Sequence, residues 1–133
     1  WPMGVAGTIT HSRSTCLAAL RRGEGLGIDI EEDEDLSEDL WDTVLLPAEQ
    51  RWARMQAAPG RAAKLVFSAK EAAYKAQYSR SRMLFGFDML AVAVRGDGFT
   101  TTFRRPAAPF VPGDRLCGGW GRAAAHILTA VAI

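Results

Sequence analysis

The sequence predicts a single α+β domain over residues 1–133, with antiparallel strands packed on a long central helix. Three observations lead to this prediction. Apolar residues alternate near both ends of the chain, residues 61–78 contain neither Gly nor Pro and are rich in Ala, and 133 residues suit one domain. Helices grouped between two sets of strands are typical of an α+β fold and not of repeated βαβ units.

The composition is that of an ordinary globular protein, with 48% apolar and 23% charged residues. No apolar run approaches the roughly 18 residues of a membrane span, and no signal peptide is visible. Cys16 and Cys117 fit no metal-ligand spacing. We therefore expect a cytoplasmic protein with reduced thiols and no contact with a membrane.

Charge is distributed unevenly along the chain. Residues 1–50 hold 11 acidic and 3 basic side chains, whereas residues 51–133 hold 4 acidic and 13 basic ones. A basic second half suits an anionic small molecule or an acidic partner protein. Because the basic residues are scattered and not interleaved with exposed aromatics, we do not expect nucleic acid as a partner.

The first part of the chain reads as turns and strands. Residues 1–7 form a turn-rich approach to a strand that ends near Ser12, and Thr15–Leu20 reads as a second strand. Arg21–Gly25 reads as the loop of a hairpin whose return strand is Leu26–Glu31. Near the first strand, small hydroxyls and His11 could receive phosphate oxygens, although a lone histidine is more often structural.

The return strand places two carboxylates side by side. With a period of two, Gly27, Asp29 and Glu31 point to one face and the apolar residues between them to the other. Adjacent carboxylates repel unless a cation lies between them, and oxygen ligands suit Mg²⁺ or Mn²⁺. The alternative is a solvated edge that begins the acidic run of residues 31–35.

Helices are predicted in the middle of the chain. Leu36–Leu46 carries an apolar stripe, and Pro47–Gln56 follows with Trp52 and Met55 expected to point inward. The long helix covers about Arg61–Tyr78. Its small or apolar packing side is expected to comprise Leu65, Ala69, Ala72 and Ala76.

The long helix also carries a polar and aromatic stripe, because residues three and four apart share a face. Glu71 precedes Lys75 by four residues, which favours an ion pair between them. The members of the stripe are Phe67, Lys70, Glu71, Tyr74 and Lys75. Taken alone, the stripe favours a surface salt bridge beside two half-buried aromatics.

Strands return after the long helix. Met83–Phe87 is an apolar segment too short for a helix, and Gly96–Gly98 is a hairpin turn. The strands expected in this part of the chain are Asp88–Val94, Phe99–Arg104, Asp114–Trp120 and His126–Ala132.

Three motifs, in this order, resemble those of the 4′-phosphopantetheinyl transferases related to surfactin-synthetase activators and siderophore-synthase component D. They are Trp1-Pro2-x-Gly4-x-x-Gly7-Thr8-Ile9-Thr10-His11-Ser12, Gly27-Ile28-Asp29-Ile30-Glu31, and Phe67-Ser68-x-Lys70-Glu71-Ala72-x-x-Lys75. Members of this type consist of two similar halves. The resemblance implies that residues 1–22 end a first half, which is otherwise missing, and that residues 23–133 form the second.

The resemblance implies an enzyme that transfers 4′-phosphopantetheine from coenzyme A to a serine of an acyl or peptidyl carrier protein. It implies Mg²⁺, for which Mn²⁺ can substitute, bound by Asp29, Glu31 and Glu71 with the Ile30 carbonyl nearby. The expected protein is a monomer. Which carrier it serves, in fatty-acid, polyketide, siderophore or other nonribosomal peptide synthesis, the sequence leaves open.

Further roles follow from the same resemblance. Glu71 would accept the serine proton, and Lys75, assisted by Lys70, would offset charge on the departing 3′,5′-ADP. Thr10 and His11 would contact coenzyme A phosphates. The residues expected to line the pantetheine path are Phe67, Tyr74, Leu84 and Phe85.

Two other readings stay open from the sequence. One is a non-catalytic module that binds coenzyme A or carrier protein, and the other is an interaction domain whose acidic run contacts a basic partner. Arg80 and Arg82, just past the stripe, are expected either to dock an acidic carrier protein or to form a solvated turn.

Overall fold

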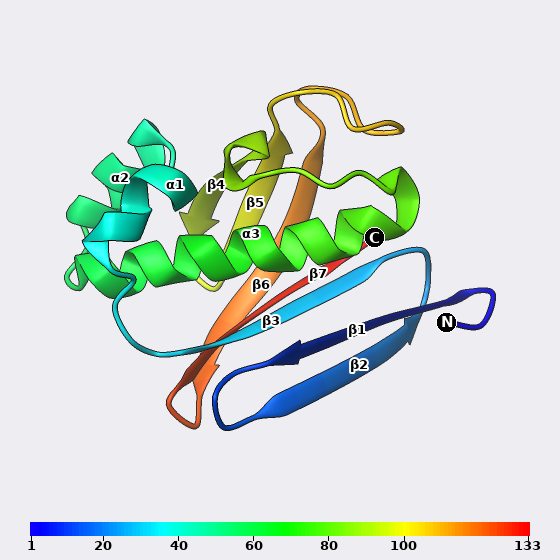
Figure 1. Ribbon diagram of the computed structural model, residues 1–133, viewed down its shortest axis with the longest axis horizontal. Helices are drawn as coiled ribbons and strands as arrows, with labels where there is room; N and C mark the ends of the chain where they lie inside the picture. Colours follow the sequence, from blue (N-terminus) through cyan, green and yellow to red (C-terminus); the bar gives the residue numbers. More distant parts are fainter.

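The computed structural model describes residues 1–133 and has the predicted α+β architecture. A five-stranded antiparallel sheet has the order β3-β7-β6-β5-β4, and the long helix α3 crosses one of its faces (Figure 1). A two-stranded ribbon, β1-β2, lies beside β3. The strands are β1 (Val5–His11), β2 (Cys16–Arg22), β3 (Leu26–Glu32), β4 (Leu90–Arg95), β5 (Gly98–Phe103), β6 (Arg115–Ala123) and β7 (His126–Ala132).

The helices gather between β3 and β4 in the sequence. They are η1 (Glu38–Leu40), α1 (Trp41–Val44), α2 (Pro47–Arg54), α3 (Pro59–Ser81) and η2 (Phe87–Met89). The helix predicted over residues 36–46 is divided into two short ones. Pro59 begins α3, since a proline is tolerated in the first turn of a helix. Because α2 ends at Arg54, Met55 is 80% exposed, and the prediction that it points inward was wrong.

The predicted packing side of α3 is confirmed, because Leu65, Ala69, Ala72 and Ala76 are all buried. Small residues on both elements let α3 lie directly on β3. A Cβ atom on Gly27 would stand only 1.9 Å from the carbonyl oxygen of Ala72. The strand that carries Asp29 is therefore pressed against the helix that carries Glu71.

The pairing of the N-terminal strands differs from the prediction. Residues 23–25 connect β2 to β3, while Arg21 and Arg22 belong to β2. However, β2 pairs with β1, and β3 pairs with β7 at the edge of the large sheet. The expected β2–β3 hairpin was therefore wrong. The glycine-rich connection fits a hairpin locally, but Gly25 and Gly27 lie against the α3 backbone, and this packing directs β3 onto the sheet under the helix.

The later strands form as predicted. β4 and β5 form the hairpin around Gly96–Gly98, and β6 and β7 close the sheet. None of the helices has the length and apolarity needed to cross a bilayer. The core has two parts, one between the C-terminal half of α3 and the sheet and one under α1 and α2.

Candidate functional site

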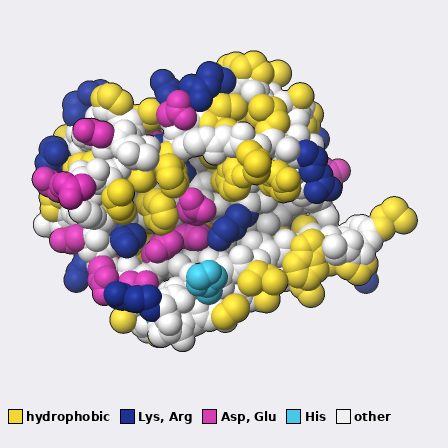
Figure 2. Space-filling view, in the orientation of Figure 1, with side chains coloured by type: hydrophobic (Ala, Val, Ile, Leu, Met, Phe, Trp, Pro, Cys, Tyr) yellow, Lys and Arg dark blue, Asp and Glu magenta, His cyan; other side chains and the backbone are white.

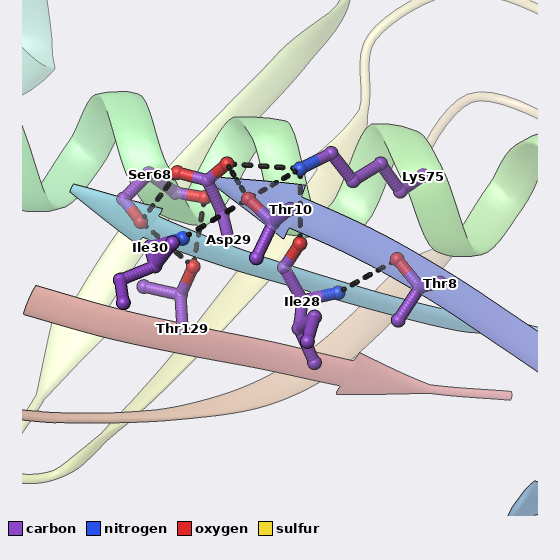
Figure 3. A network of polar contacts seen from close by, with 8 residues as sticks. All are labelled: Thr8, Thr10, Ile28, Asp29, Ile30, Ser68, Lys75 and Thr129. Carbon is purple, nitrogen blue, oxygen red and sulfur yellow. Dashed lines mark hydrogen bonds and ion pairs between the residues drawn. The ribbon is translucent and has the colours of Figure 1, made fainter. Parts of the chain in front are cut away.

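Asp29 is the centre of a polar network where α3, β1 and β3 meet (Figure 3). Its side chain is 5% exposed. One carboxylate oxygen, Oδ1, lies 3.0 Å from Lys75 Nζ and accepts a hydrogen bond from the Thr10 hydroxyl at 3.3 Å. The other, Oδ2, accepts a hydrogen bond from Ser68 Oγ at 2.9 Å. The expected Glu71–Lys75 ion pair does not form, because Lys75 turns to Asp29 instead.

The seam between β1 and β3 is held by side chains, since these two strands belong to different sheets. The hydroxyls of Thr8 and Thr10 accept hydrogen bonds from the backbone N–H groups of Ile28 and Ile30, at 3.4 and 3.3 Å. Lys75 Nζ donates to the Ile28 carbonyl at 3.0 Å and to Thr10 Oγ1 at 3.2 Å. Lys75 thus ties the helix, the ribbon and the sheet together at one point (Figure 3).

Glu31 and Glu71 flank Asp29, and the pKa of each is raised. Burial raises the pKa of Glu31 from its ordinary 4.5 to about 8, helped by the charge of Asp29 and a hydrogen bond with it, while Lys64 opposes the shift. Burial, followed by the charge of Asp29, also raises the pKa of Glu71, although Lys75 opposes it. In Figure 2 acidic side chains gather beside a basic one in the middle of this face. Acidic groups here outnumber the basic groups that could neutralise them.

A metal ion is predicted at Asp29, Ile30, Glu31 and Glu71. These residues offer carboxylate and carbonyl oxygens, which are the ligands that a hard divalent cation prefers. The half-buried carboxyl groups of Glu31 and Glu71 keep raised pKa values despite the charges of Lys64 and Lys75, and a divalent ion would supply further positive charge. No three His, Cys, Asp or Glu side chains stand close enough together to ligate one ion. Mg²⁺ commonly takes only one or two protein carboxylates and completes its shell with phosphate and water. Ligation by these residues stays a prediction.

Lys70 lies in a different environment from Glu71 and Lys75. Its side chain is 2% exposed, and Nζ contacts Glu49 Oε2 at 2.8 Å and the carbonyl oxygens of Val44 and Phe87 at 2.8 and 3.0 Å. Burial lowers the pKa of Lys70, although Glu49 opposes this. Residue spacing does not predict this pair, because Lys70 and Glu49 lie 21 positions apart on separate helices. The proposed assistance of Lys70 in catalysis stays a prediction.

Aromatic side chains line two hollows beside Glu71. A cavity of about 200 Å³ is lined by Glu71, Tyr74 and Phe85, among others. A neighbouring groove of about 330 Å³ runs along Tyr74, Lys75 and Leu84 toward β1. Three of the four residues expected on the pantetheine path therefore border these hollows. Phe67 borders neither, but its ring packs 5.5 Å from that of Phe87, which lines the first.

The two residues expected to contact phosphate differ in exposure. His11 is exposed, and its ring makes no hydrogen bond within the chain, whereas Thr10 is 4% exposed. The Thr10 hydroxyl donates to Asp29 and accepts from Ile30 and Lys75, so its hydrogen bonds are already made within the protein. Arg80 and Arg82 are exposed at the end of α3. The roles expected for these four residues stay predictions.

The sequence analysis missed three residues of the site. Ser68 lies inside the third motif, three positions before Glu71, so its place on the same helix face was a usable signal. Thr129 reaches the site from β7, and nothing in the sequence indicated that strand as a neighbour of Asp29. Glu49 is the third.

Comparison with known proteins gives consistent results. The model of the family described as the 4′-phosphopantetheinyl transferase superfamily matches residues 25–116. The 4′-phosphopantetheinyl transferase Svp of Streptomyces mobaraensis is 37% identical over 100% of this chain and 58% of its own length. The 4′-phosphopantetheinyl transferase Npt of Nocardia iowensis is 32% identical over 99% of this chain and 66% of its own. Enterobactin synthase component D of Escherichia coli is 43% identical over 57% of this chain and 38% of its own.

A solved structure shares the fold. The holo-[acyl-carrier-protein] synthase of Thermotoga maritima superposes with a TM-score of 0.66 and 18% identity, over 81% of this chain and 61% of that one. Svp and Npt match nearly all of this chain, and the chain spans 58% and 66% of their lengths. The assignment of residues 1–22 to a first half and residues 23–133 to a second stays a prediction.

Proposed function

This chain belongs to the 4′-phosphopantetheinyl transferase superfamily, and from that membership we propose that it transfers 4′-phosphopantetheine from coenzyme A to a carrier protein. The acceptor would be a serine hydroxyl on an acyl or peptidyl carrier protein, and the second product 3′,5′-ADP.

One observation in the structure supports the proposal most directly. Asp29 contacts Lys75, and burial, followed by the charge of Asp29, raises the pKa values of the nearby Glu31 and Glu71 carboxyl groups. Such an excess of acid on a half-buried surface is costly for the folded protein by itself, and it becomes favourable when a cation and a phosphorylated ligand bind. Perturbed pKa values beside an apolar cavity are typical of an active site.

Magnesium, for which manganese can substitute, would be held by Asp29 together with Glu31 or Glu71, because the structure does not bring three carboxylates close enough to share one ion. The Ile30 carbonyl lies on the same strand, β3, beside Asp29. When bound, the ion would neutralise charge on the coenzyme A pyrophosphate and so favour attack on phosphorus.

The side chains would divide the reaction between them. The carrier serine oxygen forms a bond to the pyrophosphate phosphorus next to pantetheine, while the bond from that phosphorus to 3′,5′-ADP breaks. Glu71 would take the serine proton, and its raised pKa makes it a better proton acceptor once it is ionised. Lys75 would offset the charge that grows on 3′,5′-ADP. Lys70, engaged by Glu49 and Phe87, would support the cavity wall.

The apolar hollows would hold the pantetheine arm. Tyr74 borders both of them, with Phe85 on one side and Leu84 on the other. An apolar channel with few polar groups suits a flexible chain of two amides and a thiol, which has no charge to satisfy.

The direct test is incubation of the chain with coenzyme A, Mg²⁺ and an apo carrier protein, followed by mass spectrometry of the carrier. The expected result is a mass gain of one phosphopantetheine on the carrier serine. The second candidate is a module that binds coenzyme A or carrier protein without turnover. Binding of coenzyme A without any mass gain would establish this second function.

A third candidate is an interaction domain whose acidic run, residues 31–35, contacts a basic partner. Titration with Mn²⁺ distinguishes this candidate from the transferase and from the coenzyme A module. An interaction domain would bind Mn²⁺ equally well with and without coenzyme A. A transferase or a coenzyme A module would bind it more tightly when the pyrophosphate supplies further ligands.

A further inference from the structure

Two buried hydroxyls stand behind Asp29, on the side away from Lys75 (Figure 3). Ser68 Oγ donates to Asp29 Oδ2 at 2.9 Å and lies 2.8 Å from Thr129 Oγ1. Thr129 Oγ1 in turn lies 2.9 Å from the Ser68 carbonyl oxygen, to which it donates. Ser68 is 0% exposed and Thr129 is 2% exposed, so neither can contact a ligand directly.

The two hydroxyls come from two different elements. Ser68 lies on α3, three positions and therefore about one turn before Glu71. Thr129 lies on β7 directly opposite Asp29 in the β3–β7 register, so both side chains point to the face of the sheet that α3 covers. The hydroxyl chain thus connects the Asp29 carboxylate to the helix that carries Glu71.

Burial of these hydroxyls is not explained by stability of the core. A hydroxyl taken out of water costs free energy unless it is hydrogen-bonded, and an apolar side chain of the same shape avoids that cost. Here the Ser68 hydroxyl donates to the Asp29 carboxylate, and Thr129 holds Ser68 by donating to its carbonyl oxygen and contacting its hydroxyl. Ser68 thereby fixes Oδ2 on the helix side and leaves Oδ1 to Lys75 and Thr10, which determines the plane of the carboxylate.

We propose that Ser68 and Thr129 are positioning residues, which fix the orientation of the Asp29 carboxylate relative to Glu71 for binding of a divalent cation. This inference rests on the proposed function, in which Asp29 binds the ion. Hydrogen-bond partners of metal-binding carboxylates commonly affect metal affinity by roughly 10–100-fold. An effect of this size is expected from loss of either hydroxyl.

The test compares Thr129→Val and Ser68→Ala with the unchanged chain, with the dissociation constant for Mn²⁺ measured by titration in the presence of coenzyme A. Thr129→Val keeps the shape of the side chain, and Thr129→Ser keeps the hydroxyl. Thr101 is the matched control, because it is 0% exposed and its hydroxyl also donates to a backbone carbonyl, that of Leu116 on the neighbouring strand β6. The melting temperature of each variant is measured alongside.

The expected result is a roughly 10–100-fold weaker Mn²⁺ affinity for Thr129→Val and Ser68→Ala. Thr129→Ser should bind as the unchanged chain does, and Thr101→Val should lower only the melting temperature. Unchanged affinity in the first two variants, an equal loss in Thr101→Val, or no Mn²⁺ binding by the unchanged chain would each overturn the inference. Transfer to the carrier is scored separately, so a chain that shows the affinity losses without turnover would refute the proposed enzyme and retain the positioning role.

Discussion

Helix α3 carries two lysines, Lys70 and Lys75, and each pairs with a buried carboxylate from another element. The surroundings of the two pairs differ sharply. Lys70 and Glu49 are 2% and 3% exposed, and the three contacts of Lys70 Nζ use all of its donors. Glu49 also accepts hydrogen bonds from the backbone N–H groups of Leu46 and Val92, both at 2.7 Å. Each charge in this pair has a single opposite charge and a full set of hydrogen bonds.

The Lys75–Asp29 pair is open in comparison. Lys75 is 26% exposed, and Asp29 shares its surroundings with Glu31 and Glu71. The ammonium groups of Lys75 and Lys64 therefore oppose three carboxyl groups, and the pKa values of Glu31 and Glu71 stay raised despite them. The closed pair, Lys70–Glu49, joins α2, α3 and β4, and all of its hydrogen bonds are made within the protein. At the open pair, Lys75–Asp29, the nearby carboxyl groups remain available to bind a cation. The incomplete electrostatic balance at the open pair is the reason for which we propose the functional site there and not at the closed pair.

The largest effect is expected from breaking the closed pair. Lys70→Met leaves Glu49 buried without a counter-charge, and loss of one partner of a buried pair costs about 3–5 kcal/mol in the free energy of unfolding. Chemical denaturation measures this loss. Lys64→Met is the matched control, because Lys64 lies on the same helix, is only partly buried and forms no salt bridge; about 0.5 kcal/mol or less is expected there. Equal stabilities of the two variants would show that the closed pair is not structural.

At the open pair, substitution should affect chemistry and spare the fold. Glu71→Gln removes the proposed proton acceptor, and transfer to the carrier should fall by about 10²–10⁴-fold. Its melting temperature should stay close to that of the unchanged chain, because the size and helix propensity of the side chain hardly change. Glu38→Gln, at an exposed glutamate paired with Arg54, is the control. Full transfer activity in Glu71→Gln would exclude it as the base.

The open pair should also make stability depend on pH. The pKa of Glu31 is about 8 in the folded chain against an ordinary 4.5, so the folded state holds this proton more tightly than the unfolded state. The contribution is fully present below about pH 4.5 and is lost as the pH rises through about 8. The melting temperature should therefore fall across this window, less so in Glu31→Gln, and Mg²⁺ should restore it at the alkaline end. Identical pH profiles for the two proteins would refute the shift.

The difference between the two pairs also explains how far the sequence predicts this molecule. Local patterns were sufficient for most strands, for the turn at Gly96–Gly98 and for the packing face of α3, because periodicity and turn residues encode them directly. Strand partners were not encoded in this way. The β2–β3 connection has hairpin composition, yet contact of Gly25 and Gly27 with α3 sends the strands to different sheets.

The same limit applies within the site. The alternation of β3 correctly placed Asp29 and Glu31 together, and the helix period placed Glu71 near Lys75. The period also assigned Lys70 to that stripe, although successive residues on a helix point about 100° apart and Lys70 turns toward Glu49. Which carboxylate each lysine meets depends on tertiary packing, so neither the Lys70–Glu49 pair nor the Ser68–Thr129 contact was accessible from spacing.

A smaller loss of stability than in Lys70→Met, and the sharpest test of the comparison, is expected for Lys75→Met. Because Lys75 is 26% exposed, water and protonation of the neighbouring carboxyl groups can compensate for its loss, and the cost in unfolding free energy should be about 1–2 kcal/mol, well below that of Lys70→Met. In the absence of coenzyme A, Lys75→Met should bind Mn²⁺ more tightly than the unchanged chain, since the ammonium group competes with the ion for Asp29. Calorimetric titration measures this. Weaker Mn²⁺ binding in the variant would mean that Lys75 supports the cation site and does not occupy it.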